Sequence, residues 1–145
     1  GTTTRGMVVT ILYRLEGQPR MTVSGGFTDV AGGSWYESAV AWASANDIAS
    51  GYGDGRFGPD DPITREQLAA ILFRYAGLKG RDVSVGEDTN ILSFNDAFDV
   101  SEYAVPAMQW ACGSGLIQGS DGYLMPRGAA ERAQLAAILH RFIEN

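Results

Sequence analysis

The sequence predicts an all-α repeat array in which three long helices share one core. One observation is a segment that occurs three times, starting at Thr4, Thr64 and Glu131. Another is its apolar spacing of i, i+3, i+4 and i+7, which is typical of one face of an amphipathic helix. Three like stripes that must all be buried predict a common bundle. The stripes are Val8, Ile11, Leu12 and Leu15; Leu68, Ile71, Leu72 and Tyr75; and Leu135, Ile138, Leu139 and Phe142.

Composition supports a globular chain and excludes several classes of partner. The 145 residues are 45% apolar and 19% charged, which fits one or two small domains. A formal charge of −6 leaves no basic stripe for nucleic acid. No apolar run reaches the roughly 18 residues that insertion into a membrane requires. The sequence begins at Gly1 without a signal peptide, so any export signal is expected to have been removed or to lie outside it.

The first long helix is expected over residues 4–16 and begins so early that the leading half of its repeat is missing. Gly17 and Pro19 end this helix, because glycine favours a helix C-terminus and proline cannot continue one. We therefore assign 1–17 to the second half of repeat 1 and 18–26 to a linker.

Residues 27–76 form one complete repeat, in the order loop, short helix, loop, long helix. Ser34 is the expected N-cap of the short helix, and Asn46-Asp47 ends it. Glycines and prolines then fill a loop at 48–62, in which Tyr52 and Phe57 are expected to pair as a short hairpin or to pin the loop to the core. Thr64 is the expected N-cap of the long helix.

A polar connector at 77–93 leads to a third repeat at 94–145, with the same order of parts. Tyr103 matches Trp35 and Trp110 matches Trp42, while Pro106 falls near the start of the short helix, where proline is tolerated. We expect Trp42 and Trp110 in the core, with Trp35 as either core or ligand platform. Cys112 is expected to be a buried small hydrophobe without an internal disulfide partner.

Each long helix carries an arginine three positions before its first stripe residue: Arg5, Arg65 and Arg132. A cation in the first turn opposes the helix dipole, which favours carboxylates there. Helix stability therefore does not explain these arginines. A bound anion would complement both the guanidinium and free N–H groups at the helix start. The alternative is that the arginines pair with Asp29, Asp96, Asp60 or Asp61 and fasten loop to helix.

The ordered motifs of repeat 2 resemble the S-layer homology repeat of bacterial cell-surface proteins. They are Phe27-x-Asp29-Val30, Trp35-Tyr36, Ala39-Val40, Gly51-Tyr52-Gly53-Asp54-Gly55-x-Phe57-x-Pro59 and Ile63-Thr64-Arg65. The resemblance extends over most of 94–143 and over 2–16. It implies a pseudo-threefold array, with the long helices in a central bundle and the short helices and glycine-rich loops as prongs.

The resemblance also implies a non-catalytic module at the bacterial cell surface that anchors a secreted protein to the cell wall. Such modules bind secondary cell-wall polysaccharide, commonly pyruvylated, in grooves between adjacent repeats. The implied site residues are Arg65, Asp29, Trp35 and Gly51 for repeat 2, Arg132, Asp96, Tyr103 and Gly119 for repeat 3, and Arg5 alone for repeat 1. Glu131 departs from the family's threonine and places a carboxylate beside Arg132, which is expected to neutralise that site.

Other functions have weaker support. No enzyme is expected, because the sequence has one histidine, His140, no nucleophile motif and no metal-ligand spacing. The carboxylate pairs Asp60-Asp61 and Glu87-Asp88 lie in expected turns, with nothing to raise a pKa for acid catalysis. A calcium site at Asp54, Asp60 and Asp61 lacks the spacing and terminal glutamate of an EF-hand, so no metal or cofactor is expected.

The alternative function is a protein-interaction or self-assembly module of a surface protein. The missing half of repeat 1 leaves three long helices but only two short ones. We therefore expect apolar surface exposed around Ile11 unless the missing half lies upstream or a swapped partner chain supplies it.

Overall fold

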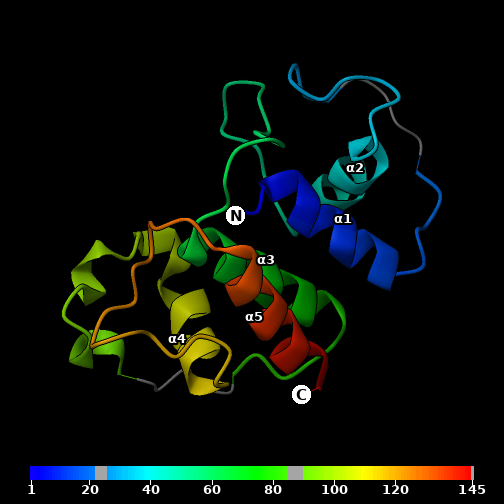
Figure 1. Cartoon of the computed structure of the whole chain (residues 1–145). Coiled ribbons are helices and arrows are strands. Elements are labelled where there is room, and N and C mark those ends of the chain that lie inside the picture. The colour runs from blue at the N-terminus through cyan, green and yellow to red at the C-terminus, as the bar shows by residue number, and fades with distance from the viewer. Residues whose placement is uncertain (22–25, 85–89, 145) are drawn as a thin grey trace. The chain divides into compact units, whose positions relative to one another are not determined.

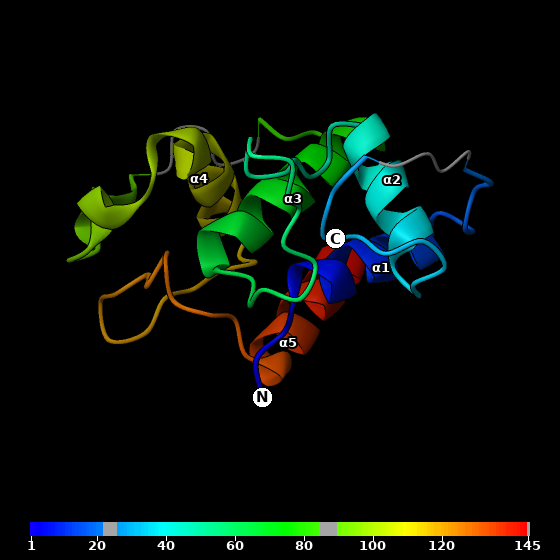
Figure 2. The same cartoon turned by 90° about the horizontal axis from the view of Figure 1, so that it is seen from above.

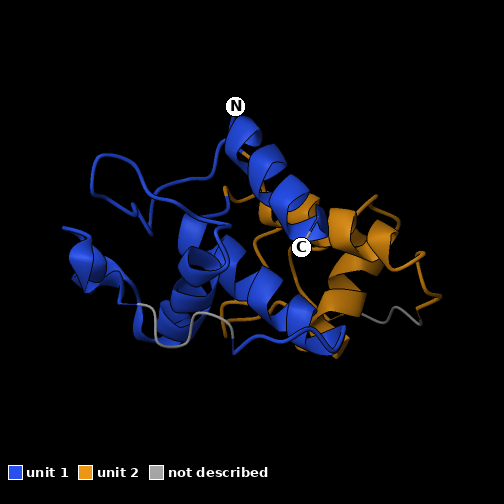
Figure 3. Cartoon of the chain, turned by 90° about the horizontal axis from the view of Figure 1, so that it is seen from below, with its two compact units in different colours: residues 1–2, 63–145 blue, residues 3–62 orange. Residues whose placement is uncertain are grey.

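A computed structural model describes residues 1–21, 26–84 and 90–144 (Figure 1). These residues contain five α-helices, three short 3-10 helices and no β-strand, which confirms the all-α prediction. They form two compact units, one of residues 3–62 and the other of residues 1–2 and 63–145 (Figure 3). No helix among these residues is long and apolar enough to cross a membrane.

The unit of residues 3–62 is built on helices α1 (Arg5–Leu15) and α2 (Glu37–Ala45), which pack against each other (Figure 1). Thr4 caps α1, since its hydroxyl accepts a hydrogen bond from the Met7 N–H at 3.1 Å. As predicted, α1 stops before Gly17, which has a positive φ of 80°. The Tyr13 and Trp42 rings join the two helices with centroids 5.8 Å apart.

The start of α2 differs from the sequence prediction, and Ser34 is not its N-cap. Trp35 and Tyr36 form a turn before the helix, so Ser34 lies too early to bond its first N–H groups through the hydroxyl. The Ser34 carbonyl instead accepts the Glu37 N–H at 3.2 Å. The end of the helix is as predicted, with Asn46 as C-cap.

The other unit contains α3 (Arg65–Leu78), α4 (Val105–Gly113) and α5 (Arg132–Glu144), with α3 packed against α4 (Figure 2). The short 3-10 helices η1 (Ile91–Ser93), η2 (Ala97–Asp99) and η3 (Glu102–Ala104) precede α4. Aromatic rings join these helices. The ring centroids of Phe73 and Trp110 are 5.6 Å apart, those of Trp110 and Phe142 are 6.3 Å apart, and those of Phe142 and Tyr75 are 6.0 Å apart.

Three local predictions in this unit are confirmed. Thr64 is the N-cap of α3, and it forms a capping box with Gln67, in which each side chain bonds the other residue's backbone N–H. Pro106 lies in the first turn of α4. Trp110 is buried, as is Trp42 in the other unit.

The predicted apolar stripes are buried to different extents. All four stripe residues of α3 are buried. On α5, Leu139 is only half-buried, and on α1 Ile11 is half-buried. The prediction is wrong for Leu15, which is 48% exposed, because it lies in the last turn of α1.

Two connecting segments fall partly outside the described residues. The predicted linker 18–26 includes residues 22–25, and the connector 77–93 includes 85–89, with its Glu87-Asp88 pair. At the start of that connector, Gly77 and Leu78 are the last two residues of α3, so the long helix is longer than predicted. Gly80, with a positive φ of 74°, follows the helix end.

Candidate ligand-binding site

The glycine-rich loop of each repeat is held by an aspartate near the start of that repeat. Both Asp29 carboxylate oxygens accept backbone hydrogen bonds, from the N–H groups of Phe57 and Gly58 at 2.8 Å each. Asp96 does the same in repeat 3, where Leu124 and Met125 donate at 2.8 Å. The two predicted site aspartates therefore shape the loops.

Electrostatics at Asp29 agree with this geometry. Desolvation raises the pKa of Asp29, but the hydrogen bonds from Phe57, Gly58 and its own backbone N–H, with the nearby Arg56 charge, lower it, and the resulting pKa lies below the ordinary value of 3.8. The ionised carboxylate is thus the form that the loop stabilises.

The backbone N–H groups at the helix starts are already bonded, which corrects the expectation that they are free for an anion. Arg65 and Glu66 donate theirs to the carbonyl oxygens of Gly128 and Pro126. In α1, Arg5 and Gly6 likewise donate to Asp61 and Pro59. A ligand at either helix must therefore be bound by side chains.

The predicted site glycines Gly51 and Gly119 are required by internal packing. A Cβ at Gly51 would lie 2.5 Å from the Phe27 ring and 2.7 Å from the Arg56 carbonyl oxygen. At Gly119 it would lie 2.5 Å from the Phe94 ring, and this glycine also has a positive φ of 72°. The opening phenylalanine of each repeat occupies the space beside its loop glycine.

Arg5 lies against the loop of repeat 2 and is enclosed there. Its guanidinium donates to the carbonyl oxygens of Phe57 at 3.1 Å and Ser50 at 2.7 Å. It also lies over two rings, 5.1 Å from the Tyr52 centroid and 4.8 Å from the Phe57 centroid. Arg5 is only 5% exposed, so in this unit the arginine fastens the loop to the helix.

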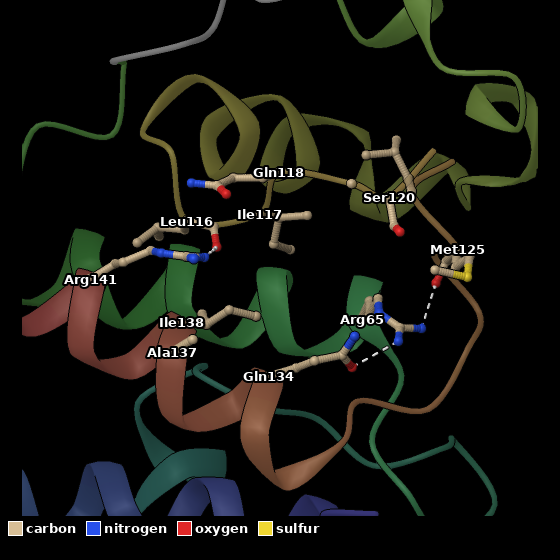
Figure 4. A pocket seen from close by; sticks show the side chains of 12 residues that line it. Arg65, Leu116, Ile117, Gln118, Ser120, Met125, Gln134, Ala137, Ile138 and Arg141 are labelled. Atoms are coloured by element: carbon tan, nitrogen blue, oxygen red, sulfur yellow. Dashed lines mark hydrogen bonds between the residues drawn. The ribbon is translucent and has the colours of Figure 1, made fainter. Parts of the chain in front are cut away.

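Arg65 lies against the loop of repeat 3, and here the arginine borders an open pocket of about 200 Å³ (Figure 4). Its guanidinium donates to the Gln134 amide oxygen at 2.7 Å and to the Met125 carbonyl oxygen at 3.4 Å. Gly128 makes room for it, because a Cβ there would lie 2.5 Å from an Arg65 nitrogen. Among the described residues, no carboxylate pairs with Arg65.

One sequence difference explains why Arg65 is open and Arg5 is covered. The residue after the loop glycine is Tyr52 in repeat 2 and Ser120 in repeat 3. The Tyr52 ring covers the Arg5 guanidinium, and its hydroxyl donates to Asp61 at 2.6 Å. Ser120 has no ring, and it lines the pocket beside Arg65 (Figure 4).

Arg141 is a second cation in this pocket, and the sequence analysis missed it. It projects from α5 and donates to the Leu116 carbonyl oxygen at 3.1 Å. Figure 4 shows Ile117 and Ile138 between Arg141 and Arg65, and none of the lining residues is acidic. A signal existed, because an arginine also recurs at the far end of each long helix, as Arg14, Arg74 and Arg141.

The other predicted site residues lie outside this pocket. Trp35, in the unit of residues 3–62, is 62% exposed, and its ring centroid lies 4.9 Å from that of the mostly buried Tyr36, with the two ring planes tilted by 42°. Tyr103 is 54% exposed before α4. Arg132 is exposed at the start of α5, and the described residues show no ion pair between it and Glu131.

The acidic loop residues of repeat 2 are bonded within the loop. Asp54 pairs with Arg56 at 3.0 Å, and Asp61 accepts the Tyr52 hydroxyl. Desolvation and this hydrogen bond raise the pKa of Tyr52 to about 12. In the part of the chain that the structure describes, no three acidic, histidine or cysteine side chains are grouped to hold a metal.

Comparison with known proteins gives one family and several relatives. Residues 26–69 match the S-layer homology domain family. The chain is 33% identical over 99% of its length to an amylopullulanase from Thermoanaerobacterium thermosulfurigenes, of which the match covers 8%. It is 30% identical over 82% of its length to the surface-layer 125 kDa protein of Lysinibacillus sphaericus, covering 10% of that protein.

A third relative is a cellulosome-anchoring protein of Acetivibrio thermocellus, which is 25% identical over 81% of this chain; the match covers 26% of that protein. The chain thus spans a small part of each of these relatives. The resemblance found in the loop and helix motifs is confirmed, and the chain belongs to the S-layer homology family, with its matched domain at residues 26–69.

Proposed function

We propose that the chain is a non-catalytic cell-wall-anchoring module that binds acidic, pyruvylated wall polysaccharide in the pocket beside Arg65. The observation that supports this most is the charge of the pocket. The chain has a net charge of −6, yet this pocket is lined by two arginines and no acidic residue. An anionic ligand is the natural complement of such a surface.

The chemistry of the pocket suits a sugar that carries a carboxylate. The planar Arg65 guanidinium can bind a carboxylate through two parallel hydrogen bonds. Ile117 and Ile138 offer an apolar surface to the face of a sugar ring or to the methyl group of a pyruvate ketal. Ser120 and Gln118 add hydroxyl and amide groups for sugar hydroxyls.

The relatives support a location at the bacterial cell surface. Two of them are a surface-layer protein and a cellulosome-anchoring protein. The amylopullulanase is an enzyme of which this chain matches only 8%, so its activity belongs to a protein much larger than the matched region. Anchoring a larger secreted protein is the role that fits all three.

Retention on purified wall tests the function. The chain should sediment with sacculi of the producing organism, and isothermal titration with the released polysaccharide should give a measurable Kd. Arg65→Gln should weaken binding by about ten- to a hundredfold, because a charged hydrogen-bond pair is lost. When the carboxyl groups of the polysaccharide have been reduced to alcohols, the wild type and Arg65→Gln should bind it equally weakly.

Two further proteins complete this experiment. Arg20→Gln removes the same charge from an exposed loop and should bind as the wild type does. Ser120→Tyr places beside Arg65 the residue that covers Arg5 in the other unit and should close the pocket. Equal binding by all variants would contradict the proposed site. Mass that rises with protein concentration in sedimentation velocity, without retention on sacculi, would favour self-association instead.

A further inference from the structure

The long helices have a second face in common, beside the predicted apolar stripe. Its four residues are spaced i, i+3, i+4 and i+7, so they lie together on one side of each helix. They are Val9, Leu12, Tyr13 and Glu16 on α1; Ala69, Leu72, Phe73 and Ala76 on α3; and Ala136, Leu139, His140 and Ile143 on α5.

On α1 and α3 a short helix covers this face. The helix α2 packs along α1, and α4 packs along α3. Each pair is joined by a tryptophan of the short helix, since Trp42 lies 5.8 Å from Tyr13 and Trp110 lies 5.6 Å from Phe73, measured between ring centroids. The leucine of the face is at most 1% exposed on both long helices, so the cover is close.

On α5 the same face is open. Its alanine and histidine are exposed, its leucine is half-buried, and its isoleucine is 57% exposed. Within the described part of this unit, no short helix packs along it as α4 packs along α3. We call these four residues the open α5 face. The sequence predicted uncovered apolar surface around Ile11 of α1, and the structure instead shows it on α5.

The two short helices cover their partners with the same set of side chains. The buried residues are Ala39, Val40, Trp42 and Ala43 on α2, and Ala107, Met108, Trp110 and Ala111 on α4. In both helices two alanines allow close approach of the backbones, an aliphatic side chain fills the gap between them, and a tryptophan meets the ring on the long helix. The same set of side chains would complement the open α5 face.

The position of Gly1 is a separate observation that leads to this face. On each covered helix, the N–H of the N-terminal arginine donates to a carbonyl oxygen in the loop that follows the covering short helix. Arg5 donates to Asp61 at 3.0 Å, Arg65 donates to Gly128 at 3.0 Å, and on α5 the Arg132 N–H donates to Gly1 at 2.8 Å. Gly1 thus stands on α5 where a loop from a covering helix stands on α1 and α3.

The next N–H group continues the comparison. Gly6 and Glu66 each donate to a carbonyl oxygen two residues earlier in the same loop, that of Pro59 or Pro126, at 2.8 Å. The equivalent N–H of Ala133 has no acceptor among the described residues. A carbonyl group two residues ahead of Gly1 would supply it.

We propose that the open α5 face is a docking site for one short helix of the same kind as α2 and α4, with a loop that enters beside Gly1. Its occupant is an amphipathic helix with alanine, an aliphatic residue, tryptophan and alanine at positions i, i+1, i+3 and i+4. Docking buries the apolar part of Leu139 and Ile143, and it places the tryptophan against His140. This site is separate from the Arg65 pocket and does not depend on the proposed function.

A chain extended at its N-terminus tests the docking site. Because Gly1 and Gly128 occupy equivalent places, a copy of residues 94–127, which contain α4 and its loop, is joined directly ahead of Gly1. Cys112 is changed to serine in both copies, and Ile143→Cys reports on the open α5 face. The thiol introduced at position 143 should react with a thiol-disulfide reagent at least about tenfold more slowly in the extended chain than in the original chain.

Ala136→Arg should abolish this protection in the extended chain, because its long charged side chain occupies the face. In the original chain it should leave the melting temperature unchanged, since position 136 is exposed and arginine is a good helix former. Ala31→Arg is the matched control, at an exposed loop position of the other unit, and should keep the protection. Replacing the tryptophan of the added helix by alanine should also restore fast labelling.

Three results would overturn the proposal. One is equal labelling of the extended and original chains. Another is protection that survives Ala136→Arg, because the added helix would then lie elsewhere. The third is protection in the original chain that rises with protein concentration while the mass doubles in sedimentation velocity, because a second copy would then cover the face.

Discussion

At the scale of single residues, the site is organised by side chains that hold the backbone. Asp29 and Asp96 each fix two successive N–H groups of their loop, and Arg5 fixes two loop carbonyl oxygens. These interactions need a charge at a defined point, so a residue of the same shape without the charge does not replace them. Arg65 also bonds a loop carbonyl oxygen, that of Met125, and it borders an open pocket.

Asp29→Asn should therefore destabilise the chain by about 1–3 kcal/mol at pH 7, because an amide cannot accept both N–H groups as the carboxylate does. The pKa of Asp29 is lowered in the folded state, so its contribution is present above the ordinary value of 3.8 and is lost as pH falls through the folded-state pKa. Urea unfolding at pH 7 and pH 3 should show the difference between variant and wild type shrinking at the lower pH.

The matched control is Asp47→Asn, at an exposed position with a positive φ of 55° that asparagine also tolerates. Its stability should equal that of the wild type at both pH values. A difference between Asp29→Asn and wild type that stayed constant between pH 7 and pH 3 would show that the Asp29 charge is not the cause.

At the scale of elements, the helices were predictable and the partners of the loops were not. The period of the stripe and the Thr64 cap are local, so the sequence sufficed for α3. Sequence alone shows only the order of segments along the chain, so it predicted that each site arginine belongs with the loop of its own repeat. The contacts of Arg5 and Arg65 with the following repeat depend on how α1 packs on α2 and α3 on α4.

The loop glycines illustrate the same limit, because their spacing identifies turns but does not show what fills the space beside them. Gly119→Ala should destabilise the chain by about 2–4 kcal/mol, from the strain of a positive φ together with overlap of the new Cβ with Phe94. Gly115→Ala has a similar φ of 77° but open space around it, so only the smaller strain, about 1 kcal/mol, should remain. Thermal unfolding of the two variants measures the difference, and equal losses would contradict the overlap.

At the scale of the whole molecule, the compact units are offset from the sequence repeats. The long helix α1 of repeat 1 packs on the short helix α2 of repeat 2, and α3 of repeat 2 packs on α4 of repeat 3. The unit of residues 3–62 thus combines the long helix of repeat 1 with the short helix and loop of repeat 2, and the other unit combines α3 of repeat 2 with repeat 3. In consequence α1 has a short-helix partner, α2, within its own unit.

This division allows one unit to be followed alone, because the single cysteine, Cys112, lies in α4. Burial raises the pKa of its thiol to about 11, so at pH 8 about one thiol in a thousand is ionised, compared with about one in ten at the ordinary value of 9.0. Labelling by a thiol-disulfide reagent at pH 8 should be at least about a hundredfold slower in native buffer than in 8 M urea. A labelling rate that rises at lower urea than the loss of helical circular dichroism would report local opening around α4. Equally fast labelling in native buffer and in urea would contradict the raised pKa of this half-buried thiol.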